Sequence, residues 1–198
     1  MFVIRRLFIC LVVFLTPLCV SSNDNLTKSK VFVEKLGETV LGKVSNPNIS
    51  ESQRNGNFKD IYLSAFDNYY ISRFVLGRHW KTIDKNIQNE FVESFNNYVV
   101  ATYAPKFKGW QGTVKAVDAK LENNYYNVIT NILNKDGPTL KLQWKMYLDK
   151  NQQFKILDVN IDGMSMLVTQ RAEFSSVIKN NPNGVNGLID AMKKKSGS

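Results

Sequence analysis

His79 is the single histidine of the chain, so catalysis or metal binding that depends on histidine would have to be built around it. A hydrolytic triad needs a nucleophile beside the imidazole, and a histidine metal site needs further ligands at suitable spacing. The surrounding segment Gly77–Trp80 supplies neither. We therefore interpret His79 as a structural residue and expect that the protein is not an enzyme.

Residues Asp158–Gly163 resemble the opening of a calcium-binding loop, because oxygen-bearing side chains alternate along the segment and a glycine follows them. Such a loop needs a bidentate Glu at its twelfth position, where this chain has Thr169. The same alternation is typical of a strand with one polar face. We expect no metal ion here, and the sequence predicts no cofactor.

The beginning of the chain is typical of a secretory signal peptide. Arg5 and Arg6 precede a short apolar run, Leu7–Val20, and a polar stretch follows it. The run is too short to span a bilayer comfortably. We expect cleavage near Asn23 and therefore export, with an uncleaved anchor as the alternative.

The predicted organisation is a signal peptide over residues 1–22, one domain over residues 23–195 and a flexible tail over residues 196–198. Cys10 and Cys19 both lie in the predicted leader. The exported chain is therefore expected to have no disulfide, no thiol nucleophile and no thiolate metal site. Its stability must come from a packed core.

The chain is basic, with 26 Lys and Arg residues against 17 Asp and Glu residues and a net charge of +9. A basic exported protein can be attracted to anionic membrane surfaces, to nucleic acid or to acidic partners. The secretory leader argues against nucleic acid. The densest cluster, Lys193–Lys195, is equally consistent with the basic end of a helix.

Apolar residues recur at helical spacing through the first half of the chain. Thr82 is a suitable N-cap for the strongest of these helices, and Pro105 is expected to follow its end. The predicted helices cover Phe32–Val40, Phe58–Tyr69, Tyr70–Leu76 and Ile83–Tyr103.

The pattern then changes to strand-like alternation, interrupted by turn sequences such as Asn123-Asn124. Four successive strands joined by tight turns predict an antiparallel meander with one buried face. Two helices follow, the last starting at Asn181-Pro182. We predict an α+β fold in which helices cover one face of a curved four-stranded sheet. The predicted strands are Gly112–Leu121, Tyr125–Leu133, Leu140–Leu148 and a fourth that contains Leu157, Val159 and Ile161.

The apolar faces of these elements could form an ordinary core or could enclose a cavity between the sheet and the helices. Periodicity does not distinguish the two. The candidate residues on the sheet are Leu140, Leu142, Trp144 and Met146, with Leu157, Val159 and Ile161 adjacent. The candidate residues on the helices are Phe91, Phe95 and Val99, with Phe74 nearby.

Two parts of the chain carry a recognisable set of residues. The helical half carries Phe74–Trp80, followed by Gln88, Phe91, Phe95 and Tyr103. The second half carries Trp144, Phe154–Val159, Ile161–Met166, Arg171, Glu173 and Phe174, with Gly184, Leu188 and Ile189 in the closing helix. Together they resemble the MlaC family, whose members are also called toluene-tolerance auxiliary proteins. Met164, Met166 and Leu157 depart from the usual pattern, which affects the shape of a pocket more than membership.

The resemblance implies a phospholipid carrier of the Gram-negative periplasm with a fold akin to cystatin and NTF2-like domains. It implies exchange of lipid between an outer-membrane lipoprotein complex and an inner-membrane ABC transporter with an MCE-type subunit, in maintenance of outer-membrane lipid asymmetry. We expect a monomer whose acyl chains are held by the candidate residues named above. Arg78, Lys106 and Lys108 are hypothesised to lie near the mouth, and Arg171 to anchor its helix through nearby carboxylates or carbonyls.

A different class of function is also open at this point. The chain could be a periplasmic adaptor, an interaction module with a filled core and no ligand. Analysis of organic extracts of the purified protein for phospholipid would distinguish the two.

Overall fold

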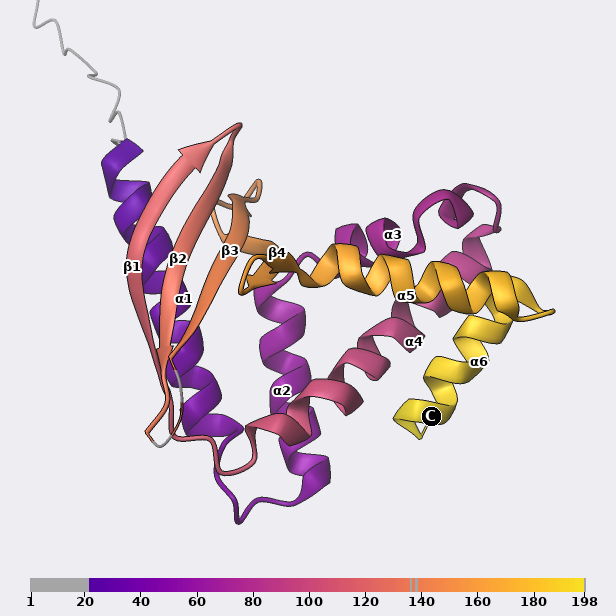
Figure 1. Ribbon diagram of the computed structural model, residues 1–198, viewed down its shortest axis with the longest axis horizontal. Coiled ribbons are helices and arrows are strands. Elements are labelled where there is room, and N and C mark those ends of the chain that lie inside the picture. The colour runs from indigo at the N-terminus through magenta and orange to yellow at the C-terminus, as the bar shows by residue number, and fades with distance from the viewer. Residues whose placement is uncertain (1–21, 136, 138, 198) are drawn as a thin grey trace, which may run out of the picture.

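The computed structural model describes residues 22–135, 137 and 139–197. Within these residues, a sheet with α1 and α2 beside it forms one half of the molecule, and helices α3 to α6 form the other (Figure 1). The predicted signal peptide lies outside the described residues, apart from Ser22. The elements in chain order are α1 (Ser22–Lys43), α2 (Glu51–Ala65), α3 (Asn68–Leu76), η1 (Gly77–Lys81), α4 (Lys85–Tyr103), η2 (Ala104–Phe107), β1 (Thr113–Glu122), β2 (Tyr125–Leu133), β3 (Leu140–Leu148), β4 (Phe154–Ile161), β5 (Met164–Ser165), α5 (Met166–Asn180) and α6 (Gly184–Ser196).

The sheet confirms the predicted α+β class and the antiparallel meander, with strand order β1-β2-β3-β4-β5. The two-residue strand β5 adds a fifth strand that pairs with the end of β4. Between β1 and β2, Asn123 and Asn124 both have positive φ values, 50° and 66°. This is the backbone that a tight two-residue hairpin requires, and Asn tolerates it better than most residues.

One face of the sheet, which we call the inner face, is covered mainly by α1. Gly37 of α1 faces Val114 of β1 so closely that an added Cβ would lie 2.7 Å from the Cβ of Val114. In the same region, the backbone N–H of Ala116 donates a 2.9 Å hydrogen bond to the carboxylate of Glu34. Ala116 begins a bulge in β1, so this side chain satisfies a backbone donor at an irregular point of the edge strand.

Several helix boundaries differ from the prediction. The first two helices begin earlier than the predicted Phe32 and Phe58, at Ser22 and Glu51. The apolar stripe expected to continue from Phe58 to Tyr69 is divided at Phe66 and Asp67, where α2 ends and α3 begins. The N-cap of α4 is Asp84 instead of Thr82, because its carboxylate accepts hydrogen bonds from the backbone of Asn86 and Ile87. A carboxylate near the helix N-terminus is also favoured by the helix dipole.

Substitution of Gly37 tests the close packing of α1 on the sheet. Gly37→Ala should destabilise the protein by about 1–3 kcal/mol, because the new methyl group has no room beside Val114. In Gly42→Ala the new Cβ meets nothing within 4 Å, so this control should gain up to about 1 kcal/mol from helix propensity. Urea denaturation measures both changes. Equal shifts in the two variants would contradict the close approach.

Candidate functional site

Three clusters of buried apolar side chains meet at α2. The helical cluster joins α3, α4, α5 and α6; the sheet cluster joins α1, the inner face and Ala65; the third cluster joins α1 and Ile61. Phe66 packs against both the helical and the sheet clusters, and Phe58 packs against the third. Tyr62 lies between them, with ring contacts to Phe58 and Phe66. We call this meeting place of Phe58, Tyr62 and Phe66 the central seam.

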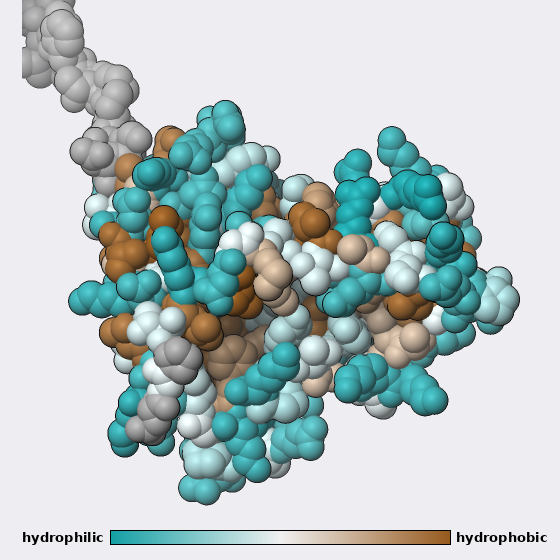
Figure 2. Space-filling model, in the orientation of Figure 1, coloured by the Kyte–Doolittle hydropathy of each residue, from teal (hydrophilic) through white to brown (hydrophobic). Residues whose placement is uncertain are grey.

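The surface of the molecule is recessed between its two halves. Figure 2 shows this recess, with hydrophobic residues on its floor and hydrophilic residues along the helices beside it. The packing explains the separation of the halves, because the described residues of α4 pack mainly on α6, α2, α3 and η2, whereas α1 is the main helical partner of the sheet. The recess therefore lies between α4 and the inner face of the sheet, which have few contacts with each other.

The predicted helix-side residues come together in the helical cluster. Phe91 and Phe95 are buried there, with stacked rings 6.0 Å apart, and both contact the ring of Phe174 edge-on. Phe74 and Val99 are half-buried against the same cluster. The structure therefore brings the four helix-side residues together in one apolar cluster. Phe91 is packed by protein on all sides, since its exposed fraction is 0%.

The predicted sheet-side residues share the inner face, with different degrees of burial. Leu142 and Met146 are buried, and Trp144 is half-buried. The indole N–H of Trp144 donates a 2.9 Å hydrogen bond to the hydroxyl of the buried Thr130. Leu140 lies near the end of the sheet and is 37% exposed. The indole of Trp144 is thus fixed along the apolar face.

The fourth strand does not present its residues as predicted. Val159 and Ile161 face inward, opposite Trp144 and Leu142. Leu157 does not share that face, because the register shifts between Lys145 and Met146 and makes it the extra residue of a bulge. The sheet cluster contains Ile156 in its place.

Leu157 instead lines a hollow of about 440 Å³ on the outer face, together with Lys145, Asp158 and α3 residues such as Phe74. A second hollow, of about 280 Å³, lies between α2, α3 and α4 and includes Lys59 and Asn96. Both linings combine Asn, Lys and Glu side chains with aromatic and aliphatic ones.

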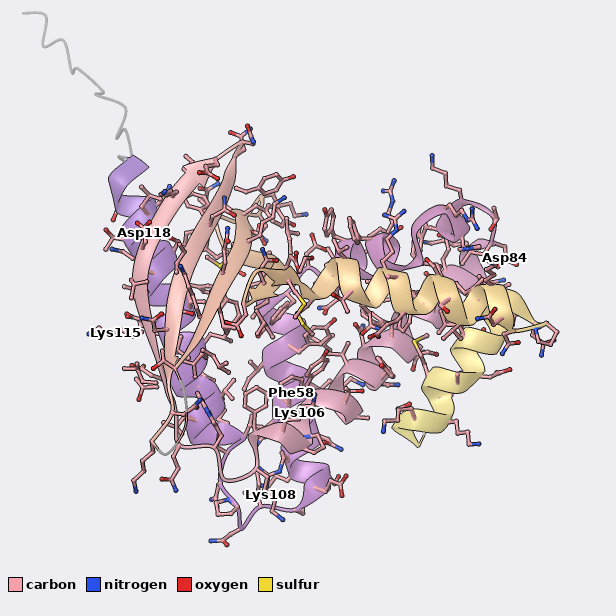
Figure 3. The ribbon with its side chains drawn as sticks, viewed as in Figure 1. Phe58, Asp84, Lys106, Lys108, Lys115 and Asp118 are labelled. Carbon is pink, nitrogen blue, oxygen red and sulfur yellow. The ribbon has the colours of Figure 1, made fainter. Side chains whose placement is uncertain are left out.

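The predicted cationic group is divided by the fold. Lys106 and Lys108 follow the end of α4, whereas Arg78 lies in η1, before the start of that helix. A helix of 19 residues is about 28 Å long. Figure 3 shows Lys106 and Lys108 on the Phe58 side of the molecule and Asp84 far from them. Phe107, between the two lysines, contacts the ring of Phe58 at 5.6 Å, so this end of α4 lies near the seam and the Arg78 end does not.

Arg171 anchors α5 differently from the prediction. Its guanidinium lies over the ring of Phe74, 5.1 Å from the centroid. It also approaches the backbone of Gly77 so closely that an added Cβ would lie 2.8 Å from its Nε. The contact joins α5 to the end of α3 by stacking, which suits the planar guanidinium group.

Two of the residues considered for catalysis or metal binding accept hydrogen bonds at helix ends, His79 through its backbone and Asp158 through its side chain. The backbone carbonyl of His79 accepts hydrogen bonds from Thr82, at the end of η1. The carboxylate of Asp158 accepts hydrogen bonds from the Ser165 hydroxyl and the Leu167 backbone, at the start of α5. Among the described residues, no group of three His, Cys, Asp or Glu side chains is arranged to hold a metal ion. None of the described helices has the length and apolar character needed to cross a membrane.

The two halves are joined at the break between α2 and α3. The backbone N–H of Asp67 donates a 3.0 Å hydrogen bond to the carbonyl of Ile156 in β4. The carboxylate of Asp67 caps α3 by accepting from Tyr70, and it also accepts a 2.6 Å hydrogen bond from the hydroxyl of Tyr147 in β3. This last bond raises the pKa of Tyr147 to about 12, with smaller effects of burial and of the Asp67 and Asp149 charges. We call these contacts the junction.

Comparison with known proteins identifies the family of this arrangement. Residues 34–194 match the sequence profile described as MlaC protein. The chain belongs to the MlaC family. No curated protein sequence matches it significantly.

A solved structure shares the fold. It is a phospholipid-binding protein from Ralstonia solanacearum in complex with a phospholipid, with a TM-score of 0.70 and 18% sequence identity. The match covers 85% of this chain and 96% of that one. In this MlaC chain, the family match includes the sheet, α4, α5 and nearly all of α6, so both sides of the recess belong to it.

The sequence prediction did not include the residues of the central seam. Phe58, Tyr62 and Phe66 belong to a recognisable apolar stripe, but the stripe does not show that three clusters meet there. The only available signal was the density of aromatic residues on α2. It identifies a contact surface without identifying its partners.

Loss of the Asp67 carboxylate should weaken the junction. We expect Asp67→Ala to lower the free energy of unfolding by about 2 kcal/mol, the sum of a lost helix cap and a lost tertiary hydrogen bond. Asp84→Ala removes only a cap and should cost about 1 kcal/mol. Urea unfolding of the two variants, with Tyr147→Phe as a third, measures the difference. If Asp67→Ala and Asp84→Ala lose equal stability, the bond to Tyr147 contributes nothing.

Proposed function

We propose that this protein is a periplasmic phospholipid carrier that holds acyl chains between the inner face of the sheet and the helices. The observation that carries the proposal is the family match, which spans both sides of the recess. The similarity in fold to a protein solved with a bound phospholipid supports it. In this proposal the chain exchanges lipid between an outer-membrane lipoprotein complex and an inner-membrane ABC transporter with an MCE-type subunit. It acts as a monomer, without a cofactor and without catalysing a reaction. It belongs to a transport system that maintains the lipid asymmetry of the outer membrane and contributes to toluene tolerance.

The transfer energetics require nearly complete enclosure of the chains. Each methylene moved from hydrocarbon into water costs about 0.8 kcal/mol. Two ordinary acyl chains would therefore cost on the order of 20 kcal/mol if they were exposed. The half-buried apolar residues of the inner face and of α4, Trp144, Val159, Ile161 and Val99, would supply contacts that replace this exposure.

The fold offers a route for opening. The junction ties α2 and α3 to β3 and β4 by hydrogen bonds, while α4 has its main packing partners among the helices. Widening the central seam would separate apolar surfaces without breaking the junction. Met146, Met164 and Met166 would help the walls adapt, because methionine is flexible and polarisable. Tight binding of the lipid would by itself prevent its release. The partner proteins of the carrier would therefore favour the open form.

The alternative, an adaptor with a filled core, is favoured by one observation. Phe91 and Met146, two of the predicted lining residues, have exposed fractions of 0%. In a carrier these side chains would have to move or lie behind the cavity wall. The two proposals differ in whether the purified protein contains lipid.

Extraction of the purified protein tests the carrier proposal. We expect about one phospholipid per protein molecule in organic extracts of protein purified from a Gram-negative periplasm, measured by mass spectrometry. Val159→Asn changes a residue of the inner face opposite Trp144. The amount of lipid that stays bound should fall about fivefold or more, because an amide facing the chains weakens lipid binding by about 1 kcal/mol or more. Val117→Asn is the control, since Val117 is 52% exposed.

Circular dichroism of both variants checks that they are folded. Wild-type protein without phospholipid would contradict the carrier proposal and favour the adaptor. Equal retention by folded Val159→Asn and wild type would remove Val159 from the site.

Export provides a separate prediction. We propose that residues 1–22 are a cleaved signal peptide, so the full chain expressed in a Gram-negative host should be released by osmotic shock as a protein that begins at Asn23. Intact mass measurement checks the cleavage point. An Arg5→Glu/Arg6→Glu variant should accumulate uncleaved, because the charged region before the apolar run is needed for export. Full-length wild-type protein in the cytoplasmic fraction would contradict the prediction.

A further inference from the structure

Tyr62 has a buried hydroxyl group without a protein partner. Its side chain is 5% exposed, and its hydroxyl oxygen has no hydrogen-bond partner among the described residues. Buried hydroxyl groups are normally paired, because an unpaired one keeps the full desolvation penalty. The hydroxyl of Tyr147, by contrast, is paired with Asp67. The arrangement at Tyr62 needs an explanation that packing alone does not give.

The position of this hydroxyl group connects it with the proposed ligand. The ring of Tyr62 stacks on Phe58 at 6.5 Å and tilts against Phe66 at 5.1 Å. Phe66 packs against the helical and sheet clusters and Phe58 packs against the third cluster, so Tyr62 is connected with all three. A lipid that separates the clusters would therefore pass beside Tyr62, at the central seam.

The surroundings of Tyr62 favour an uncharged acceptor. Burial raises the pKa of Tyr62, and the neighbouring Tyr103 raises it further. The same burial opposes any other charge at this point, including a phosphate. Lys106 lies farther out, with its ammonium group 4.9 Å from the centre of the Tyr103 ring, and it is exposed. A phosphate would be better placed near Lys106, with the neutral part of the lipid at Tyr62.

From this geometry we infer that the Tyr62 hydroxyl donates a hydrogen bond to an ester carbonyl oxygen of a bound diacyl lipid. The inference rests on the proposed function and adds the polar contact that orients the lipid. An ester carbonyl is neutral, accepts hydrogen bonds and lies directly at the top of an acyl chain. Its position between the chains and the phosphate matches the position of Tyr62 between the apolar clusters and Lys106.

Tyr62→Phe tests the inference, because it should leave the lipid-free protein as stable as wild type or more stable and should weaken lipid binding. In lipid-free protein the variant should melt at the same temperature as wild type or higher, because no hydrogen bond is lost. In loaded protein it should bind a diacyl phosphatidylethanolamine roughly three- to tenfold more weakly. Tyr147→Phe is the matched control, since it removes a paired hydroxyl outside the seam. It should melt at a lower temperature and bind the lipid as wild type does.

A dialkyl ether lipid of the same headgroup and chain length identifies the acceptor, because it has no ester carbonyl. Wild type should prefer the diacyl lipid by about the same factor, and Tyr62→Phe should show no preference. Weaker binding of both lipids by the variant would assign the hydroxyl to another acceptor and overturn the inference. Unchanged binding, or a lower melting temperature of the lipid-free variant, would also overturn it. If wild type binds neither lipid, the carrier proposal itself fails.

Discussion

Apolar surface must be kept from water in every state of this protein. In the structure, the apolar surfaces of the sheet and of the helices are covered partly by each other and partly by α1, α5 and α6. Hydrophobic burial is non-directional and roughly proportional to area. One set of side chains can therefore satisfy it against protein or against hydrocarbon. A carrier needs apolar side chains that can contact either protein or lipid. An ordinary core differs, because its side chains pack in one arrangement only.

The contacts that must persist are of another kind. The junction consists of hydrogen bonds with defined donors and acceptors, from the backbone of Asp67 to Ile156 and from Tyr147 to the Asp67 carboxylate. Hydrogen bonds have strict geometry, so they hold α3 against β4 in one orientation. The start of α5 is fixed similarly by Asp158 and Ser165. Directional contacts thus set the positions of the elements around a seam whose own contacts are apolar.

Much of this architecture could be predicted from local pattern. The bounds of β2 and β3 were predicted as Tyr125–Leu133 and Leu140–Leu148, and the structure has the same bounds. Strict alternation and the Asn123-Asn124 turn contain the necessary information. The boundary between the second and third helices lies before the predicted Tyr69–Tyr70, at Phe66 and Asp67, because the apolar stripe continues across the break. The bridge from Phe66 to Ile156 and the cap of Asp67 depend on tertiary contacts and on side-chain geometry that the stripe does not contain. The predicted N-cap of α4 lies two residues before the observed one because Thr82 and Asp84 are both suitable caps, and the choice between them depends on the preceding turn.

The site was less predictable because a site depends on the contacts between elements. Leu157 has the spacing of an inward residue, but one bulge against Lys145 and Met146 moves it to the other face. A register shift of this kind follows from pairing with a neighbouring strand, and a single strand does not encode it. Arg78 and Lys106 are close in chemistry, yet the length of α4 separates them. Periodicity indicates which side of an element is apolar, and the tertiary fold determines whether that side meets a partner, a ligand or another element.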